Sequence, residues 1–149
     1  MAGDYPFDTM SDKAFMVYLG LANHMGSSVY YEVQVKLRTQ NEPLPNSTVG
    51  RPSPLPSLFE YRVLIAGGAV WEKSLILCFK TLSLDDESYV VGIMTLDGLD
   101  IPITKSIPQS GDRGGPFVQL FFELWIYDME SHSFSFDKRF VGIWLNVTV

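Results

Sequence analysis

The stretch that decides the fold is Val29–Arg38, VYYEVQVKLR, which follows the turn-like run NHMGSS at residues 23–28. Apolar residues alternate with mostly polar ones along it. One face carries Val29, Tyr31, Val33, Val35 and Leu37, and the other carries Tyr30, Glu32, Gln34, Lys36 and Arg38. This period of two residues is typical of a β-strand with one buried face. We therefore predict a strand here that is solvated on its polar face.

The same period recurs along most of the chain, and no helical period of 3.6 residues interrupts it. We expect further strands at residues 14–22, 58–66, 69–80, 89–96, 99–103, 117–127 and 138–149, with a short one near 134–136. The spacing of the first two strands indicates an antiparallel hairpin. Gly67-Gly68 and Asp97-Gly98 predict two more hairpins, and Pro102 favours an edge strand.

Strands this dense without crossover helices predict an antiparallel all-β protein. We expect an immunoglobulin-like β-sandwich of two sheets, with about eight or nine strands, in a single domain over residues 1–149. Residues 1–13 contain Pro6 and scattered polar residues, which indicates an irregular lead-in. Residues 104–116 have the glycine and proline content of a loop.

Residues 39–57 differ from the strands because they hold five of the nine prolines in the chain. Proline lacks an amide donor and fixes φ, so an extended crossover loop between the two sheets is expected. Loops on a rigid scaffold often carry function. We therefore expect contact residues in this loop and in the turn at 23–28, and the candidates are His24, Met25, Pro43, Pro45, Pro52 and Pro54.

The composition excludes several classes of protein. The net charge of −6 argues against a nucleic-acid partner, which requires a basic face. Cys78 is the only cysteine, so it forms no internal disulfide, and its apolar surroundings predict a buried thiol. No apolar run is long enough to span a bilayer, and the first residues do not resemble a signal peptide. We expect no cofactor.

Short motifs give few further sites. Asn46 and Asn146 each begin an N-glycosylation sequon, and Asn46 lies in the exposed loop. Asp85, Asp86 and Glu87 form an acidic run that is expected to be a solvated turn, with calcium binding as the alternative. The two histidines, at positions 24 and 132, accompany no nucleophile pattern.

The aromatic residues allow two readings. The chain has three tryptophans (Trp71, Trp125 and Trp144), seven tyrosines and ten phenylalanines; most of these are expected in the core, with Tyr18 and Tyr30 more exposed. The alternative is an exposed aromatic platform of a carbohydrate-binding module.

A hydrolase is a further hypothesis for the function. Its catalytic carboxylates would come from a pool of strand residues, Glu32, Glu60, Glu72 and Glu123.

Several blocks of the sequence carry a family resemblance. They are YPFD near the start, the run from VYLGLANHMGSS through VYYEVQVKLRTQNEPLPNST, then PSPLPSLFEYRV, the Trp71-Glu72 pair, QLFFELWIYD and RFVGIWLNVT. In these blocks the chain resembles the extracytoplasmic domain of the archaeal membrane-protein family known as domain of unknown function 1616. The resemblance covers residues 5–148. It implies a β-rich domain outside the cell, attached to the membrane through segments absent from this chain, and it carries no catalytic residues.

Together these observations favour a non-enzymatic recognition or assembly domain at the archaeal cell surface. Its partner would be a cell-surface protein or a glycan. The carbohydrate-binding module is the alternative, and the hydrolase is the least favoured reading.

Overall fold

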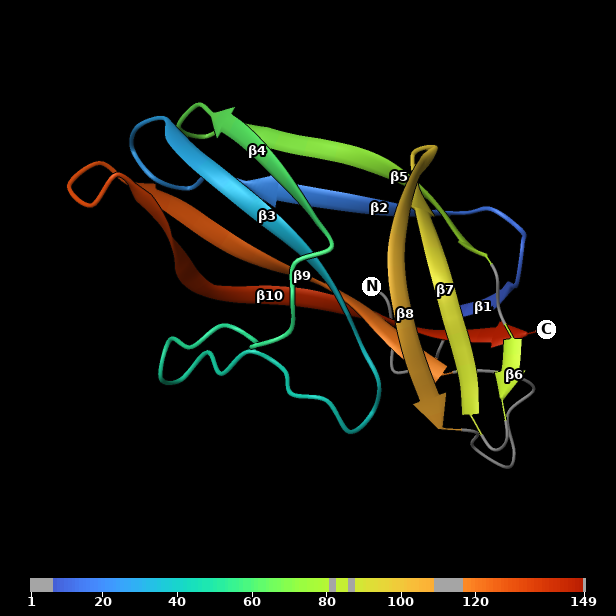
Figure 1. Ribbon diagram of the computed structural model, residues 1–149. Helices are drawn as coiled ribbons and strands as arrows, with labels where there is room; N and C mark the ends of the chain where they lie inside the picture. Colours follow the sequence, from blue (N-terminus) through green and yellow to red (C-terminus); the bar gives the residue numbers. More distant parts are fainter. Residues whose placement is uncertain (1–6, 81–82, 86–87, 109–116, 149) are drawn as a thin grey trace. The chain divides into compact units, whose positions relative to one another are not determined.

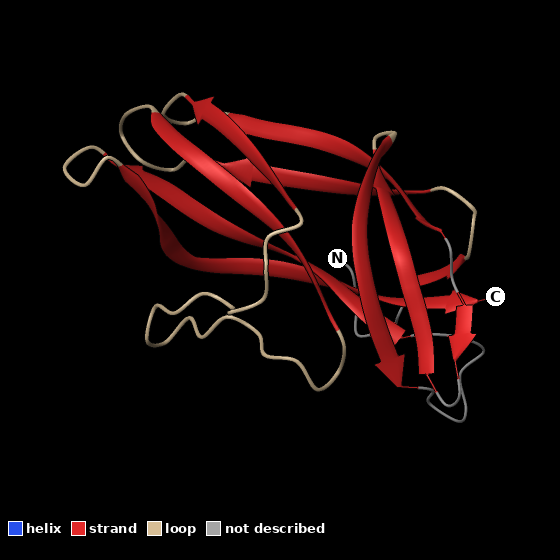
Figure 2. Ribbon diagram, viewed as in Figure 1, coloured by secondary structure: helices blue, strands red, loops and turns tan. Residues whose placement is uncertain are grey.

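A computed structural model describes residues 7–80, 83–85, 88–108 and 117–148, and within these ranges the chain forms strands and loops without a helix (Figure 2). The strands are β1 (Phe7–Met10), β2 (Phe15–Ala22), β3 (Val29–Arg38), β4 (Phe59–Ile65), β5 (Val70–Lys80), β6 (Ser83–Asp85), β7 (Ser88–Leu96), β8 (Leu99–Pro108), β9 (Phe117–Asp128) and β10 (Ser133–Thr148). One sheet has the order β1-β10-β9-β3-β4. The other has the order β2-β5-β7-β6, with β8 paired to β7. The predicted all-β, two-sheet, sandwich-like class is confirmed, and the immunoglobulin-like subtype stays a prediction.

The local patterns locate most strands well. β3 has the predicted bounds, and β2, β4, β5 and β7 begin or end within one residue of the predicted positions. The hairpin at Asp97-Gly98 is also confirmed, since Leu96 pairs with Leu99 and both turn residues have positive φ, 50° and 85°. Among the described strands β8 pairs only with β7, as Pro102 predicts.

Three predicted connections are wrong. β2 and β3 belong to different sheets, so the turn at 23–28 does not close a hairpin. β4 and β5 are likewise in different sheets, so Gly67-Gly68 links two sheets. The loop at 39–57, expected to cross between sheets, instead joins β3 to β4, which pair antiparallel from Val29↔Ile65 to Val35↔Phe59. Turn residues reverse the chain equally well within one sheet and between two sheets. The choice of partner strand depends on residues far away in sequence.

Three strand ends also differ from prediction. Part of the expected lead-in is β1, which pairs in parallel with β10 from Phe7↔Leu145 to Met10↔Thr148. β8 continues into the expected loop because its residues Thr104–Pro108 find partners on β7, as in Val90↔Ser106. β10 is one strand, although two were expected. Backbone pairing to a neighbour extends these strands past residues with weak strand preference.

The chain divides into two compact units. The first comprises Met1–Tyr18, Ser74–Gln119 and Ile143–Val149, and the second comprises Leu19–Lys73 and Leu120–Gly142. In the first unit, Phe15 lies over the buried Phe79 with ring centroids 5.9 Å apart. The second unit contains β3, β4 and the adjacent parts of β9 and β10 (Figure 1). The candidate site lies wholly within the second unit.

Candidate functional site: an aromatic groove on the second unit

A groove with a volume of about 440 Å³ lies on one face of the β4-β3-β9-β10 sheet. β3 supplies Tyr30, Glu32 and Gln34 at every second position, and the other strands and the β9–β10 turn supply Arg62, Trp125, Tyr127, His132, Ser133 and Phe134. Alternation along a strand places such residues on the same face. We call this surface the aromatic groove.

Three aromatic rings pack against one another in the groove. The centroid of Tyr30 lies 5.9 Å from that of Tyr127 and 5.2 Å from that of Phe134, and the last two rings are 5.3 Å apart. The tilted and edge-on geometries are those that aromatic quadrupoles prefer. The guanidinium of Arg62 lies over Phe134 at 5.1 Å, within the range of a cation–π contact. Tyr30 keeps 38% of its surface exposed, so this cluster is accessible from solvent.

Glu32 organises the polar side of the groove. It is 3% exposed, and both of its carboxylate oxygens accept hydrogen bonds. Gln34 Nε2 donates to one at 2.7 Å, and Arg62 Nε donates to the other at 2.9 Å. The hydrogen bond to Glu32, reinforced by the charge of that carboxylate, raises the pKa of the Arg62 guanidinium. The groove therefore presents polar groups in fixed positions beside the aromatic rings.

A buried ion pair lies on the same face of β3 and β9. Lys36 Nζ lies 2.6 Å from Glu123 Oε1, and the two side chains are 4% and 0% exposed. Ser53 of the proline-rich loop completes the network, because its N–H donates to Glu123 Oε2 at 2.6 Å and its carbonyl accepts from Lys36 Nζ at 2.8 Å. Trp125 Nε1 donates to Glu123 Oε1 at 3.3 Å. The network thus fixes the loop and also orients a ring of the groove.

This network corrects the prediction that the polar face of β3 is solvated. Glu32, Lys36 and Arg38 are all buried. Arg38 donates from Nε to the Glu42 carbonyl at 2.8 Å, and burial lowers the pKa of its guanidinium although Glu42 offsets part of that effect. The alternation correctly predicts the side of the strand on which each residue lies. It cannot reveal that the loop at 39–57 folds back over that side.

The turn at 23–28 has a structural explanation. Asn23 is fully buried, and its Nδ2 donates to the carbonyls of Ser27 at 3.0 Å and Ile65 at 2.8 Å, while Oδ1 accepts from the Met25 N–H at 2.8 Å. A Cβ on Gly67 would lie 2.9 Å from the Met25 carbonyl oxygen. The hydrogen bonds of Asn23 and the close approach of Gly67 therefore hold the turn at 23–28 against the turn that follows β4.

Only some of the candidate contact residues lie on the surface. His24 and Met25 are exposed, as are Pro43 and Pro54. Pro52 is half-buried. Pro45 is buried, which is a correction, because the loop is drawn onto the sheet face through its anchor at residue 53.

The sequons differ in accessibility. Asn46 is exposed, and its Oδ1 accepts from the N–H groups of Thr48 at 3.1 Å and Val49 at 3.3 Å. Asn146 is half-buried within β10, where it pairs with Asp8 of β1. The loop sequon is therefore the accessible one. Of the acidic run, Asp86 and Glu87 lie outside the described residues, and the structure describes only the backbone of Asp85.

The aromatic and acidic residues singled out by sequence differ in their burial. All three tryptophans are half-buried, so they are neither part of the fully buried core nor fully exposed. Tyr18 and Tyr30 are exposed, and Cys78 is buried, as predicted. Glu60 and Glu72 are exposed, whereas Glu32 and Glu123 are the buried carboxylates described above. No cluster of three or more His, Cys, Asp or Glu side chains suited to a metal occurs in the ranges that the structure describes.

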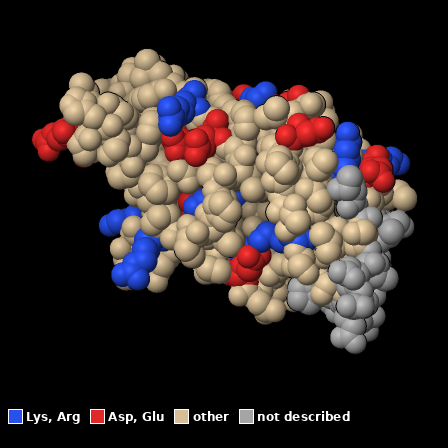
Figure 3. All heavy atoms as spheres, viewed as in Figure 1, with Lys and Arg blue, Asp and Glu red and all other residues tan. Residues whose placement is uncertain are grey.

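Charges of both signs are interspersed on the face shown in Figure 3, with large uncharged areas between them.

The sequence singles out Trp125, Tyr30 and Glu32 separately but does not show that they lie together. The alternation places all three on one face of their strands, and this signal groups them once the pairing of β3 with β9 is known.

A comparison of the chain with protein-family models, curated proteins and solved structures finds no match. The family resemblance described above stays a prediction based on the quoted residues.

Proposed function

We propose that this chain is a non-enzymatic recognition domain whose ligand binds in the aromatic groove. The observation that carries the proposal is the coexistence of partly exposed rings and rigidly held polar side chains in one concave surface. Binding sites are typically lined by apolar and aromatic groups, with a few well-placed polar groups that set orientation. The groove has both elements.

The state of the carboxylates supports binding over catalysis. A general acid or base must reach a proton of the substrate. Glu32 already accepts from Gln34 and Arg62, and Glu123 accepts from Lys36, Ser53 and Trp125. Each of their carboxylate oxygens already accepts from a protein donor, so we assign both carboxylates a supporting role.

Carbohydrate is the ligand class that the groove favours. The C–H groups on one face of a sugar ring are weakly positive and pack on the negative face of an aromatic ring. Trp125 and Tyr30 offer such rings beside Gln34, which can hydrogen-bond hydroxyl groups. This makes the carbohydrate-binding module the leading specific form of the recognition domain.

The family resemblance supports an extracytoplasmic, membrane-attached parent protein. In that setting the exposed Asn46 sequon would be an acceptor for glycans. The described ranges contain no helix with the length and apolarity of a membrane span.

The test is titration with soluble oligosaccharides built from glucose, mannose or N-acetylglucosamine, followed by calorimetry and tryptophan fluorescence. We expect at least one of them to bind, and we expect Trp125→Ala and Gln34→Ala to abolish or strongly weaken binding. Trp71→Ala is the matched control, because Trp71 is also half-buried but does not line the groove. Undiminished binding by Trp125→Ala would contradict the assignment of the groove, and the absence of binding by any oligosaccharide would contradict the ligand class.

A further inference from the structure

A second hollow lies on the other face of the β3-β9 pair, again within the second unit. Its volume is about 240 Å³. β3 contributes Val33 here and its even-numbered residues to the groove, so the two hollows lie on opposite faces of this strand. Most of the lining is apolar, and it includes Leu19, Leu21, Ala22, Val33, Phe122 and Leu124.

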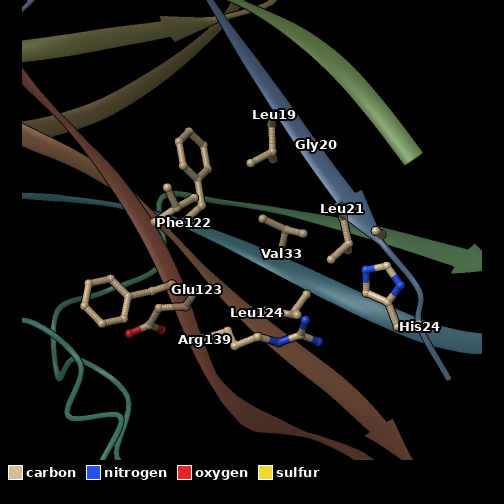
Figure 4. A pocket seen from close by; sticks show the side chains of 12 residues that line it. Leu19, Gly20, Leu21, His24, Val33, Phe122, Glu123, Leu124 and Arg139 are labelled. Atoms are coloured by element: carbon tan, nitrogen blue, oxygen red, sulfur yellow. The ribbon is translucent and has the colours of Figure 1, made fainter. Parts of the chain in front are cut away.

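The ionisable side chains of this cavity are unevenly distributed. Figure 4 shows His24 and Arg139 toward one side, while Leu19 and Phe122 lie at the other. Glu123 also lines the cavity, but its carboxylate points away from the leucine side chains and is bonded to Lys36. The groups left at the mouth are therefore a guanidinium and an imidazole.

Arg139 is positioned by a neighbour on its own strand. Its Nε and Nη2 donate to Asp137 Oδ2 at 2.9 and 2.6 Å, and its side chain remains 53% exposed. A guanidinium has five N–H donors in a planar fork. These two bonds therefore leave Nη1 and the second hydrogen on Nη2 able to reach an anionic group at the cavity mouth.

The size of the cavity sets the size of its occupant. An apolar cavity of roughly 150 Å³ in another protein stays dry and takes up benzene, which has six carbon atoms. On that scale the present cavity accommodates about ten carbons. An apolar ligand would also supply the dispersion contacts that a void denies to its lining.

We infer that the cavity binds a medium-chain carboxylic acid, with the alkyl chain among the leucine, valine and phenylalanine side chains and the carboxylate at Arg139 and His24. The apolar interior favours the alkyl chain, and the remaining N–H donors of Arg139 favour an anionic head group. This activity is separate from the aromatic groove and does not depend on the proposed function.

The experiment is calorimetric titration of the full chain with decanoate below its micellar concentration, with decanol as the comparison ligand. We expect decanoate to bind more tightly than decanol, and Arg139→Gln to weaken decanoate about tenfold while changing decanol little. Leu124→Trp should abolish binding of both by filling the cavity. Arg62→Gln, which alters only the aromatic groove, should leave decanoate binding unchanged.

Several results would overturn the inference. No decanoate binding by the native chain excludes the site, and equal affinity for decanol and decanoate excludes the head-group contact. Retained binding in Leu124→Trp places the ligand elsewhere. If that variant fails to fold, Leu21→Phe fills the same cavity more gently and carries the same expectation. Loss of oligosaccharide binding in Arg62→Gln with decanoate binding intact separates the two sites.

Discussion

Replacing Lys36 by methionine tests whether the buried ion pair holds the face of β3 together. Methionine retains much of the length of the lysine stem but leaves Glu123 as an unpaired charge with 0% of its side chain exposed. Breaking a buried pair in this way typically costs about 3–5 kcal/mol. The Ser53 carbonyl also loses the donor that lies 2.8 Å away. We expect the free energy of unfolding to fall by about 4 kcal/mol.

The assay is equilibrium unfolding in urea, followed by tryptophan fluorescence and circular dichroism. With a dependence on urea of about 2 kcal/mol per molar, the midpoint should fall by about 2 M. Asp137→Asn is the control, because it breaks an ion pair whose side chains are 53% and 26% exposed and should cost no more than about 1 kcal/mol.

Removing both buried charges sharpens the test. The double variant Lys36→Met, Glu123→Leu should recover at least about 1 kcal/mol relative to Lys36→Met alone, because no isolated charge remains. The Ser53 N–H, which then lacks its carboxylate acceptor, limits the recovery. If Lys36→Met keeps its native spectrum and loses less than about 1 kcal/mol, the ion pair does not stabilise this face and the reasoning fails.

Three further predictions concern the turns and the core. Asn23→Ala should cost about 2–4 kcal/mol in urea unfolding, because it removes two buried donors and one acceptor; a cost below 1 kcal/mol would refute the lock between the two turns. Gly67→Ala should lower the free energy of unfolding by about 1–3 kcal/mol, because the new Cβ would lie 2.9 Å from the Met25 carbonyl oxygen. The control Gly26→Ala, whose Cβ would have nothing within 4 Å, should change it by less than about 0.5 kcal/mol, and equal effects of the two variants would contradict the contact. Tyr31→Phe should leave the melting temperature unchanged or raise it, since the buried hydroxyl has no hydrogen-bond partner in the described part of the chain, and a clear fall would reveal one.

Part of the candidate site could be predicted from sequence. Glu32 and Glu123 belong to the pool of four strand glutamates, with Glu60 and Glu72, that the sequence singles out, and Tyr30 is expected to be exposed. Their roles as supports could not be predicted, because the partners of Glu123 are 70 residues away at Ser53 and on a different strand at Lys36. Hydrogen-bond partners at such separations leave no periodic signal in either segment.

The sequence by itself determined where most of the strands run and which of their residues share a face, because the side-chain alternation of a strand is a local property of its backbone. β3 shows this most clearly, since its predicted and observed bounds coincide. The tertiary structure decided which strands pair and what covers each face, because both depend on contacts between distant segments. The run 23–28 predicted a hairpin, and Asn23 instead ties it to the turn after β4. The polar face of β3 was expected in solvent, and Ser53 of the proline-rich loop instead bonds to Lys36 on that face and to Glu123 of β9.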